Sequence, residues 1–383
     1  MNIYDNWNDE LIKLKENKNY RSFPHIVHRD KFVIKEGREM INFSSNDYLG
    51  IATEYSLRTE FLKNVNQEEL LFSASSSRLL TGNFSCYDRL EKLLTHLFDS
   101  EAALTFNSGY HMNIGILPAI SDSNTLVIAD KLVHASIIDG IRLTGIPFER
   151  YRHNDYAHLE KILCNNFDRY RRIIVVTESI FSMDGDEADL KRLVAFKSLF
   201  PNMMLYVDEA HAIGLRGEKG LGCAEQYGCI KDIDFLCGTF GKAIGSIGAY
   251  IICNNTVREL LINRMRPLIF TTALPPINIL WTEFILQRLY TFKNKREHLH
   301  SISILLKDIL EQKGYSSNST SHILPLVTKQ SQLALLKAEE MHNKGFYVLP
   351  VRPPTVPENG SRLRFSLTSN ISVDDIMELK ELL

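Results

Sequence analysis

The sequence predicts an α/β fold with a mostly parallel central sheet, followed by a smaller α+β region. Short apolar runs such as residues 173–176 alternate with longer helical patterns such as residues 190–199. Uninterrupted apolar runs are typical of parallel strands that are covered on both faces. The alternation changes near Leu274-Pro275-Pro276, and the second region begins there.

The individual elements follow from hydrophobic periodicity. Trp7, Leu11 and Leu14 lie on one face of a predicted helix over residues 7–18. Strands are predicted at residues 104–106, 125–129, 148–151, 172–177, 204–207, 235–237 and 248–253. Beyond them, we expect one long helix over 277–313, a strand at 322–327, a helix at 331–344, strands around 346–351 and 362–367, and a helix from Val373. We therefore predict an N-terminal helix and strand segment (1–45), a large α/β domain (46–275) and a small α+β domain (276–383).

Composition narrows the class of protein. The 383 residues carry 44 Lys and Arg against 46 Asp and Glu, so no basic field points to nucleic acid or to an anionic membrane. The hydrophobic content of 44% is ordinary for a soluble globular protein. Neither a secretory signal nor an apolar stretch long enough for a membrane span is present, so we expect a cytoplasmic protein. The six cysteines show no spacing typical of zinc sites, and we expect buried thiols and no metal.

Polar residues follow four of the predicted strands. The carboxyl ends of parallel strands meet at one edge of a sheet, where ligands bind in open α/β folds. We therefore expect one site built from these residues: Asp130 and His134; Glu178, Ser179 and Ser182; Asp208, Glu209 and His211; and Thr239 and Lys242.

The segment VDEAH (207–211) is similar to a Walker B box of ATPases. Such a box requires a Walker A loop on an earlier strand. The comparable pair Gly241-Lys242 lies downstream, is followed by Ala243, and has Leu236 in place of the first glycine. The sequence therefore does not favour an ATPase.

Asp208 and Lys242, 34 positions apart, suit the chemistry of pyridoxal 5′-phosphate. A lysine forms a Schiff base with this cofactor and moves protons, and a carboxylate keeps the pyridine nitrogen protonated. The turn at residues 107–110 offers backbone N–H groups for a phosphate, and His134 is a candidate for the face of the ring.

Each of these residues has a simpler interpretation when it is taken alone. Asp208 could cap a helix, and Lys242 could be a solvated charge in a glycine-rich loop. His211 could be a core histidine, and Ser182 could cap the turn at residues 183–185. Taken together and in this order, the residues predict a pyridoxal-phosphate enzyme but no substrate.

Ten motifs extend this hypothesis. With them the chain resembles the α-oxoamine synthases, pyridoxal-phosphate enzymes of the aspartate-aminotransferase fold (fold type I), from about Arg21 to the C-terminus. The motifs are FSSNDYLG (43–50), SRLLTGN (77–83), FNSGYHMN (106–113), DKLVHASIIDGIRL (130–143), TESIFSMDGDEADL (177–190), VDEAHAIGLRGEKGLG (207–222), GTFGKAIGSIGAY (238–250), TTALPP (271–276), RPPTVP (352–357) and SRLRFSLT (361–368).

The resemblance implies a role for each matching residue. Lys242 is implied as the Schiff-base lysine, Asp208 as the partner of the pyridine nitrogen, and His134 as the histidine stacked on the ring. The other implied cofactor contacts are His211 and Ser182 near the phenolic oxygen, Gly109 and Tyr110 through their backbone, Thr239 at the phosphate, and Thr271 or Thr272 at the phosphate of a neighbouring subunit in a homodimer. The implied substrate contacts are Asn46 and Arg364 for the amino-acid carboxylate, with His134 beside them, and Arg21 and Thr355 for the acyl group.

RPPTVP (352–357), with HND (153–155) and MDGD (183–186), most resembles the biotin-pathway member of the family. That resemblance implies condensation of L-alanine with a pimeloyl thioester of coenzyme A or of acyl carrier protein. The alternatives are a glycine C-acetyltransferase, another α-oxoamine synthase, and a regulatory or scaffold protein that keeps the fold without the chemistry. SASSSR (73–78) departs from the glycine-rich loop of many members, and the loss of glycines is expected to stiffen this loop.

Overall fold

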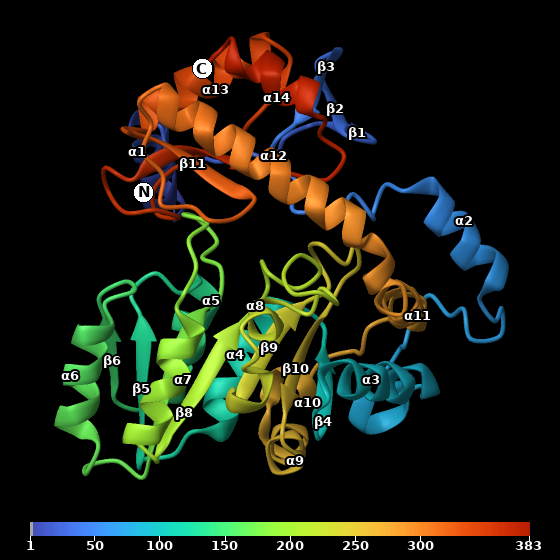
Figure 1. Cartoon of the computed structure of the whole chain (residues 1–383), viewed down its shortest axis with the longest axis vertical. Helices are drawn as coiled ribbons and strands as arrows, with labels where there is room; N and C mark the ends of the chain where they lie inside the picture. Colours follow the sequence, from blue (N-terminus) through green and yellow to red (C-terminus); the bar gives the residue numbers. More distant parts are fainter. Residues whose placement is uncertain (1–2) are drawn as a thin grey trace. The chain divides into compact units, whose positions relative to one another are not determined.

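A computed structural model of the chain describes residues 3–383 (Figure 1). The chain divides into two compact units, which are described separately. The large unit contains residues 54–182 and 187–296, and the small unit contains the described residues up to 53 together with 183–186 and 297–383. The predicted domain boundaries at 45/46 and 275/276 stay predictions, and the compact units themselves divide after residues 53 and 296.

The large unit is built on a seven-stranded sheet whose strand order is β4-β10-β9-β8-β7-β5-β6 (Figure 1). The ladders from β9 to β6 are parallel, and β10 runs antiparallel to both of its neighbours. All seven predicted strands are present, and the prediction of a mostly parallel central sheet is confirmed. Their bounds are β4 (Ala102–Phe106), β5 (Thr125–Asp130), β6 (Phe148–Tyr151), β7 (Arg172–Glu178), β8 (Met203–Asp208), β9 (Phe235–Thr239) and β10 (Ala249–Cys253).

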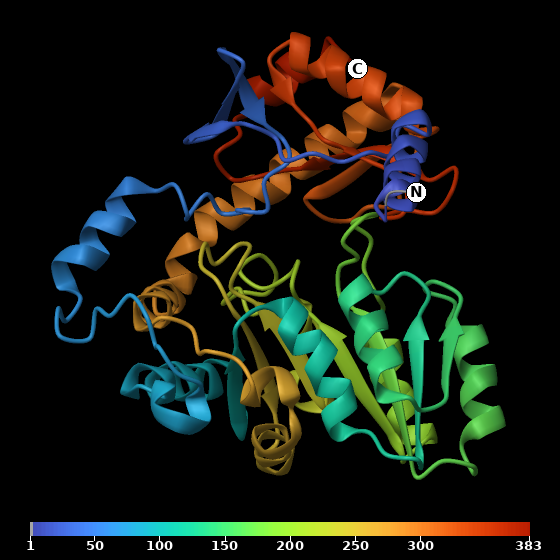
Figure 2. The same cartoon turned by 180° about the vertical axis from the view of Figure 1, so that it is seen from behind.

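Helices cover this sheet. Apolar residues of α4, α5, α9 and α10 form one core with the strands, and Figure 2 shows α4 and α5 crossing the sheet. Helices α3, α6 and α7 pack against β4, β6 and β8, respectively. The helices of this unit are α2 (Tyr55–Asn64), α3 (Ser85–Phe98), α4 (Gly109–Ile120), α5 (Ala135–Thr144), α6 (Tyr156–Asn166), α7 (Leu190–Leu199), α8 (Cys223–Gln226), α9 (Asn255–Arg264), α10 (Arg266–Ile269) and α11 (Pro276–Leu286), with a π-helical turn at Arg78–Gly82 and a 3-10 turn at Ile230–Asp232.

The prediction of one continuous helix over residues 277–313 is wrong. Helix α11 ends at Leu286, a 3-10 turn follows at Leu289–Phe292, and α12 (Lys293–Gln312) then begins. The turn buries Leu289 and Phe292, and apolar residues continue through it, so the sequence shows no break in periodicity. Helix α11 packs against α3 of the large unit, whereas α12 continues into the small unit.

The small unit contains two sheets. One has the order β1-β2-β3-β12 and the other has the order β11-β14-β13. The predicted strands around 346–351 divide between these sheets, because β12 pairs with β3 and β13 pairs with β14. The elements are α1 (Asp5–Glu16), β1 (Val27–Arg29), β2 (Phe32–Lys35), β3 (Arg38–Asn42), β11 (Ile323–Lys329), α13 (Ser331–Asn343), β12 (Phe346–Tyr347), β13 (Pro350–Val351), β14 (Ser361–Ser366), α14 (Val373–Lys380) and most of α12.

The cysteines are all free, and Cys86, Cys223, Cys229, Cys237 and Cys253 are buried as predicted. The prediction is wrong for the sixth, Cys164, which is exposed on α6. The apolar side of α6, which includes Leu163, packs against the protein interior, and the Cys164 thiol lies on the side that faces solvent.

Within residues 3–383, no helix is long and apolar enough to cross a membrane.

Candidate active site

Three strands of the large unit end in polar residues that lie side by side. Glu178 ends β7, Asp208 ends β8 and Thr239 ends β9. Glu178 and Asp208 are register partners on neighbouring parallel strands, so their side chains leave the same face of the sheet. Asp208 is 5% exposed, and it therefore needs hydrogen-bond donors to remain charged.

Asp208 receives its donors from α4 and from the chain that follows β8. The Asn113 side-chain amide donates to one oxygen of Asp208 at 3.0 Å, and the Ala210 backbone N–H donates to the other at 2.9 Å. The Tyr206 hydroxyl donates to the amide oxygen of Asn113 at 2.5 Å. This contact fixes the orientation of the amide, because a flip would set the Tyr206 hydroxyl against an NH₂ group.

His134 lies at the start of α5, where it caps the helix. Its Nδ1 accepts the Ser136 backbone N–H at 3.2 Å and lies 2.8 Å from the Ser136 hydroxyl. The same hydroxyl accepts a hydrogen bond from Asn113, which connects His134 to the network around Asp208. Desolvation by the surrounding protein lowers the pKa of His134, against the opposite effect of Asp208 and with a further lowering by Lys242. The imidazole is therefore neutral near pH 7.

Lys242 follows β9 in the loop before β10. Its Nζ lies 2.7 Å from Nε2 of His211, a residue that is 5% exposed. A lysine amine that reacts with an aldehyde must be deprotonated, and a buried imidazole within hydrogen-bond distance can take or return that proton. The structure thus brings together the two residues that the sequence placed after β8 and β9.

The start of α4 forms a candidate phosphate cradle. Ser108 caps the helix, with its hydroxyl accepting the His111 backbone N–H at 3.2 Å, and Gly109 is the first helical residue. A methyl group placed on Gly109 would meet the Thr239 side chain at 3.8 Å, so this helix end faces the Thr239 hydroxyl. Free N–H groups at a helix N-terminus together with a hydroxyl suit a phosphate. Tyr110, the next residue, is half exposed and donates its hydroxyl to Asp139.

Ser182 and Glu178 complete this group of residues. Ser182 lies after β7 and is 7% exposed, and its backbone N–H donates to the Glu178 carboxyl group, as does that of His134. The Oε1 atom of Glu178 is buried and has no hydrogen-bond partner within the described residues. Desolvation and then the charge of Asp208 raise the pKa of Glu178 to about 8.

The arrangement of these residues in the large unit fits pyridoxal 5′-phosphate. The fit rests on a buried carboxylate held by oriented donors, a lysine paired with a histidine, a helix N-terminus beside a threonine hydroxyl, and a buried carboxyl oxygen that lacks a partner. Lys242 would hold the aldehyde, Asp208 the pyridine nitrogen, and α4 with Thr239 the phosphate. When bound, the cofactor supplies an electron sink for a carbanion.

Thr271 and Thr272 lie in the loop between α10 and α11. The Asn107 side-chain amide donates to the Thr272 carbonyl at 2.6 Å and to the Thr271 hydroxyl at 3.4 Å. The loop is therefore fixed next to the turn that begins α4 in the same chain. Whether either threonine reaches a neighbouring subunit stays a prediction.

The small unit holds four of the five residues predicted for the substrate, and the fifth, His134, lies in the large unit. The Arg21 guanidinium donates to the Thr355 hydroxyl at 2.8 Å, and that of Arg364 donates to the Asn46 amide oxygen at 3.3 Å. Both predicted pairs are thus in contact within this unit. The Tyr48 hydroxyl also donates to the Asn46 oxygen, at 3.0 Å. Two donors on this oxygen turn the NH₂ of Asn46 away from them, where it can donate to a ligand.

The pattern of strand ends could not identify four residues of these networks, namely Asn113, Ser136, Tyr206 and Tyr48. Asn113 is a polar residue within the apolar stretch of α4 at residues 112–120, which is a weak signal of a buried hydrogen-bond partner. Tyr206 is a buried aromatic residue within a strand, and its sequence context gives no signal.

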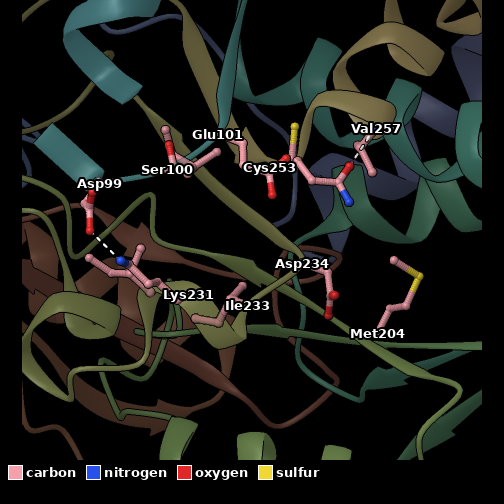
Figure 3. Close-up of a pocket in the computed structure, with 12 residues that line it drawn as sticks. Asp99, Ser100, Glu101, Met204, Lys231, Ile233, Asp234, Cys253 and Val257 are labelled. Atoms are coloured by element: carbon pink, nitrogen blue, oxygen red, sulfur yellow. Dashed lines mark hydrogen bonds and ion pairs between the residues drawn. The ribbon is translucent and has the colours of Figure 1, made fainter. Parts of the chain in front are cut away.

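One cavity lies at the other edge of the large sheet (Figure 3). It has a volume of about 570 Å³, and residues at the beginnings of β4, β8 and β9 and at the end of β10 line it. Its surface mixes apolar side chains with an exposed ion pair between Lys231 and Asp99. None of the predicted site residues lines it.

Comparisons with known proteins agree with this geometry. The family model for aminotransferase class I and II matches residues 38–382. A protein of Pasteurella multocida named "Putative 8-amino-7-oxononanoate synthase" is 52% identical over 371 residues, which are 97% of this chain and 96% of that protein. A Haemophilus influenzae protein of the same name is 50% identical over 374 residues, 98% of both chains.

Solved structures are similar over nearly the whole chain. A serine palmitoyltransferase of S. paucimobilis with a bound PLP–myriocin aldimine has a TM-score of 0.88 at 27% identity and covers 99% of this chain and 96% of its own. The 8-amino-7-oxononanoate synthase of Francisella tularensis has a TM-score of 0.75 at 27% identity, with 90% of this chain and 96% of its own covered.

Proposed function

Because this chain belongs to the aminotransferase class I and II family, and within it to the α-oxoamine synthases, we propose that it makes 8-amino-7-oxononanoate for biotin biosynthesis. Membership makes it a fold type I acyltransferase that depends on pyridoxal 5′-phosphate. The proposed reaction joins L-alanine to a pimeloyl thioester and releases CO₂ and the free thiol. The observation that carries the proposal is the identity of 50% or more, over at least 96% of the chain, with relatives of that name.

The residues of the large unit supply the acid–base chemistry in this proposal. Lys242 removes the α-proton of the amino acid, and His211, 2.7 Å from the lysine nitrogen, accepts or returns protons at that nitrogen. Asp208 holds a negative charge at the pyridine nitrogen, and the Asn113 amide keeps that carboxylate ionised and oriented. Neutral His134, oriented by Ser136, covers the ring and can donate a hydrogen bond from Nε2.

In the proposal the small unit recognises the substrates. The Arg364 guanidinium and the Asn46 NH₂ bind the amino-acid carboxylate, since a planar guanidinium matches a carboxylate in two hydrogen bonds. Arg21 and Thr355 contact the acyl substrate, and their own hydrogen bond fixes the arginine. The contact of Arg21 with Thr355 ties RPPTVP (352–357), the segment that favours the biotin-pathway activity, to the N-terminal segment.

A product assay separates this activity from its alternative, a glycine C-acetyltransferase. The enzyme is incubated with L-alanine, glycine or L-serine, each with pimeloyl-coenzyme A or acetyl-coenzyme A, and the products are identified by mass spectrometry. We expect 8-amino-7-oxononanoate from L-alanine and the pimeloyl thioester, and no product from a Lys242→Ala control. Product from glycine and acetyl-coenzyme A alone would contradict the proposal and support the alternative. Comparing pimeloyl-coenzyme A with the pimeloyl carrier protein identifies the natural thioester.

We also propose that the enzyme is a cytoplasmic homodimer. The loop at residues 70–82 exposes Phe72 (75%) and Leu80 (79%), and the neighbouring segment exposes Phe270 (70%). The Ala273 backbone N–H donates to the Ser76 carbonyl at 2.9 Å, so these apolar side chains belong to adjoining segments. A second copy that covers this surface would remove the side chains from water.

Light scattering after size-exclusion chromatography tests the dimer. We expect twice the chain mass of 43.9 kDa for the wild type, and a shift toward the single-chain mass in Phe270→Glu. A monomeric wild-type enzyme with full activity would contradict this part of the proposal.

The six free cysteines support a reducing compartment for the protein.

A further inference from the structure

Glu178 lies in the cofactor site and has no role in the chemistry proposed above. It is 2% exposed and ends β7 directly beside Asp208, the last residue of β8. Both side chains leave the face of the sheet that α4 and α5 cover. Two carboxyl groups therefore occupy neighbouring positions in a region that water scarcely reaches.

The hydrogen-bond partners of these two groups differ. Asp208 has a donor on each oxygen, from the Asn113 amide and the Ala210 backbone. Glu178 receives the backbone N–H groups of His134 and Ser182, but its Oε1 is buried without a partner in the described part of the chain. A buried carboxylate with an unsatisfied oxygen is costly, and protonation of Glu178 removes the charge from that oxygen.

The neighbouring charges favour the same distribution of protons. Two adjacent buried carboxyl groups do not both ionise readily, and the group with the better set of donors keeps the negative charge. The charged or titratable groups that act on Glu178 are Asp208 and Lys242, and His134 touches it through the backbone. Lys242 is one cation facing two carboxyl groups, so it can compensate one negative charge.

We propose that Glu178 is a positioning residue of the cofactor site. Its neutral carboxyl group fixes the main chain at His134 and at Ser182, the two residues that the resemblance places on the ring face and near the phenolic oxygen. Asp208 then remains the ionised member of the pair, opposite the pyridine nitrogen. This inference rests on the cofactor dependence of the family and is independent of the substrate proposed above.

The test uses the holoenzyme with Glu178→Gln and Glu178→Leu. Glutamine keeps an acceptor for the two backbone N–H groups and replaces the carboxyl O–H with an N–H donor. Leucine keeps a similar size but leaves both N–H groups unpaired. The matched control is Glu91→Gln on α3, a second buried carboxyl group, which accepts the Thr105 backbone N–H at 2.9 Å and is not among the predicted site residues.

Two measurements decide the outcome: the dissociation constant of pyridoxal 5′-phosphate, and the pH midpoint of its absorption band in the enzyme. We expect Glu178→Gln to leave both near the wild-type values. Glu178→Leu should weaken cofactor binding by roughly 10- to 100-fold, because unpaired buried N–H groups must be accommodated. Glu91→Gln should lower the melting temperature without moving the absorption band or its midpoint.

Two results would overturn the proposal. A downward shift of the midpoint by about one pH unit or more in Glu178→Gln would mean that a negative charge was removed, since an anion nearby favours the protonated form of the cofactor-bound nitrogen. Unchanged cofactor affinity and spectrum in Glu178→Leu would mean that the carboxyl group positions nothing. If the leucine variant does not fold, the midpoint of the glutamine variant alone decides. Neither result depends on whether the enzyme makes 8-amino-7-oxononanoate.

Discussion

Replacing Asp208 with Asn tests the network at the end of β8. An Asn side chain has one acceptor oxygen where the carboxylate has two. If that oxygen keeps the Ala210 N–H, the new NH₂ faces the NH₂ of Asn113. Asn113 cannot turn to accept it without losing the Tyr206 hydroxyl, which donates to its oxygen at 2.5 Å. At least one buried donor is therefore left without an acceptor.

The magnitude follows from these contacts. One unpaired buried donor costs about 1–3 kcal/mol of folding free energy, which corresponds to a fall of a few degrees in the melting temperature. The variant also loses the charge opposite the pyridine nitrogen. Hydrogen bonds to charged groups contribute about 1.5–3 kcal/mol, so cofactor affinity should fall roughly 10- to 150-fold. We expect Asp208→Asn to show both effects, in thermal unfolding and in titration of the apoenzyme with cofactor.

A second aspartate provides the control. Asp234 accepts from Lys197 at 2.6 Å and from the Leu205 backbone at 2.7 Å, at the other end of β8. Asp234→Asn should also lose stability, but it should bind the cofactor as the wild type does. If Asp208→Asn kept the wild-type affinity and absorption spectrum, the assignment of Asp208 to the pyridine nitrogen would be refuted.

Three further predictions follow from the two units. Lys242→Ala should lose both the visible absorption band of the bound cofactor and all product, and a retained band would exclude this lysine as the point of attachment. Tyr48→Phe should raise the half-saturating L-alanine concentration about fivefold with kcat little changed. The reason is that one hydrogen bond of about 1 kcal/mol, from the Tyr48 hydroxyl, orients Asn46 toward the carboxylate of the substrate. An equal loss in kcat would contradict a binding role. The pKa of Glu178 is raised from 4.5 to about 8. Between these two values the folded protein holds a proton that the unfolded chain releases. The contribution of this proton to stability is therefore complete below about pH 4.5 and is lost as the pH rises through 8. Thermal unfolding from pH 5 to 9 should show this decline, and a Glu178→Gln variant with the same slope as the wild type would contradict it.

The sequence was sufficient to predict the central sheet because its strands are buried on both faces. Residues 173–176 are fully buried, and an uninterrupted apolar run of this length is typical of a parallel strand that helices cover on both sides. The N-terminal strands gave no comparable signal, since β1 (Val27–Arg29) is exposed along its whole length. The sequence does not reveal the break between α11 and α12, because apolar residues continue through the turn that separates them.

Sequence reasoning predicted the members of the site better than their interactions. Asp208 and Lys242 each follow a strand, so their shared edge could be predicted from the order of elements alone. The orientation of Asn113 depends on how α4 packs on β8, which the sequence does not encode in any short pattern. The sequence places Glu178 after a predicted strand, but its burial beside Asp208 depends on the register of β7 with β8.

The most direct test of the proposed reaction follows the carboxyl carbon of the amino acid. L-alanine labelled at its carboxyl carbon is mixed with the holoenzyme and pimeloyl thioester, and labelled CO₂ and free thiol are counted together. The proposed condensation predicts one CO₂ for each thiol released, with none in the absence of the thioester. Thiol release from L-alanine and the pimeloyl thioester without labelled CO₂, or thiol release from glycine with acetyl-coenzyme A but not from L-alanine, would contradict it.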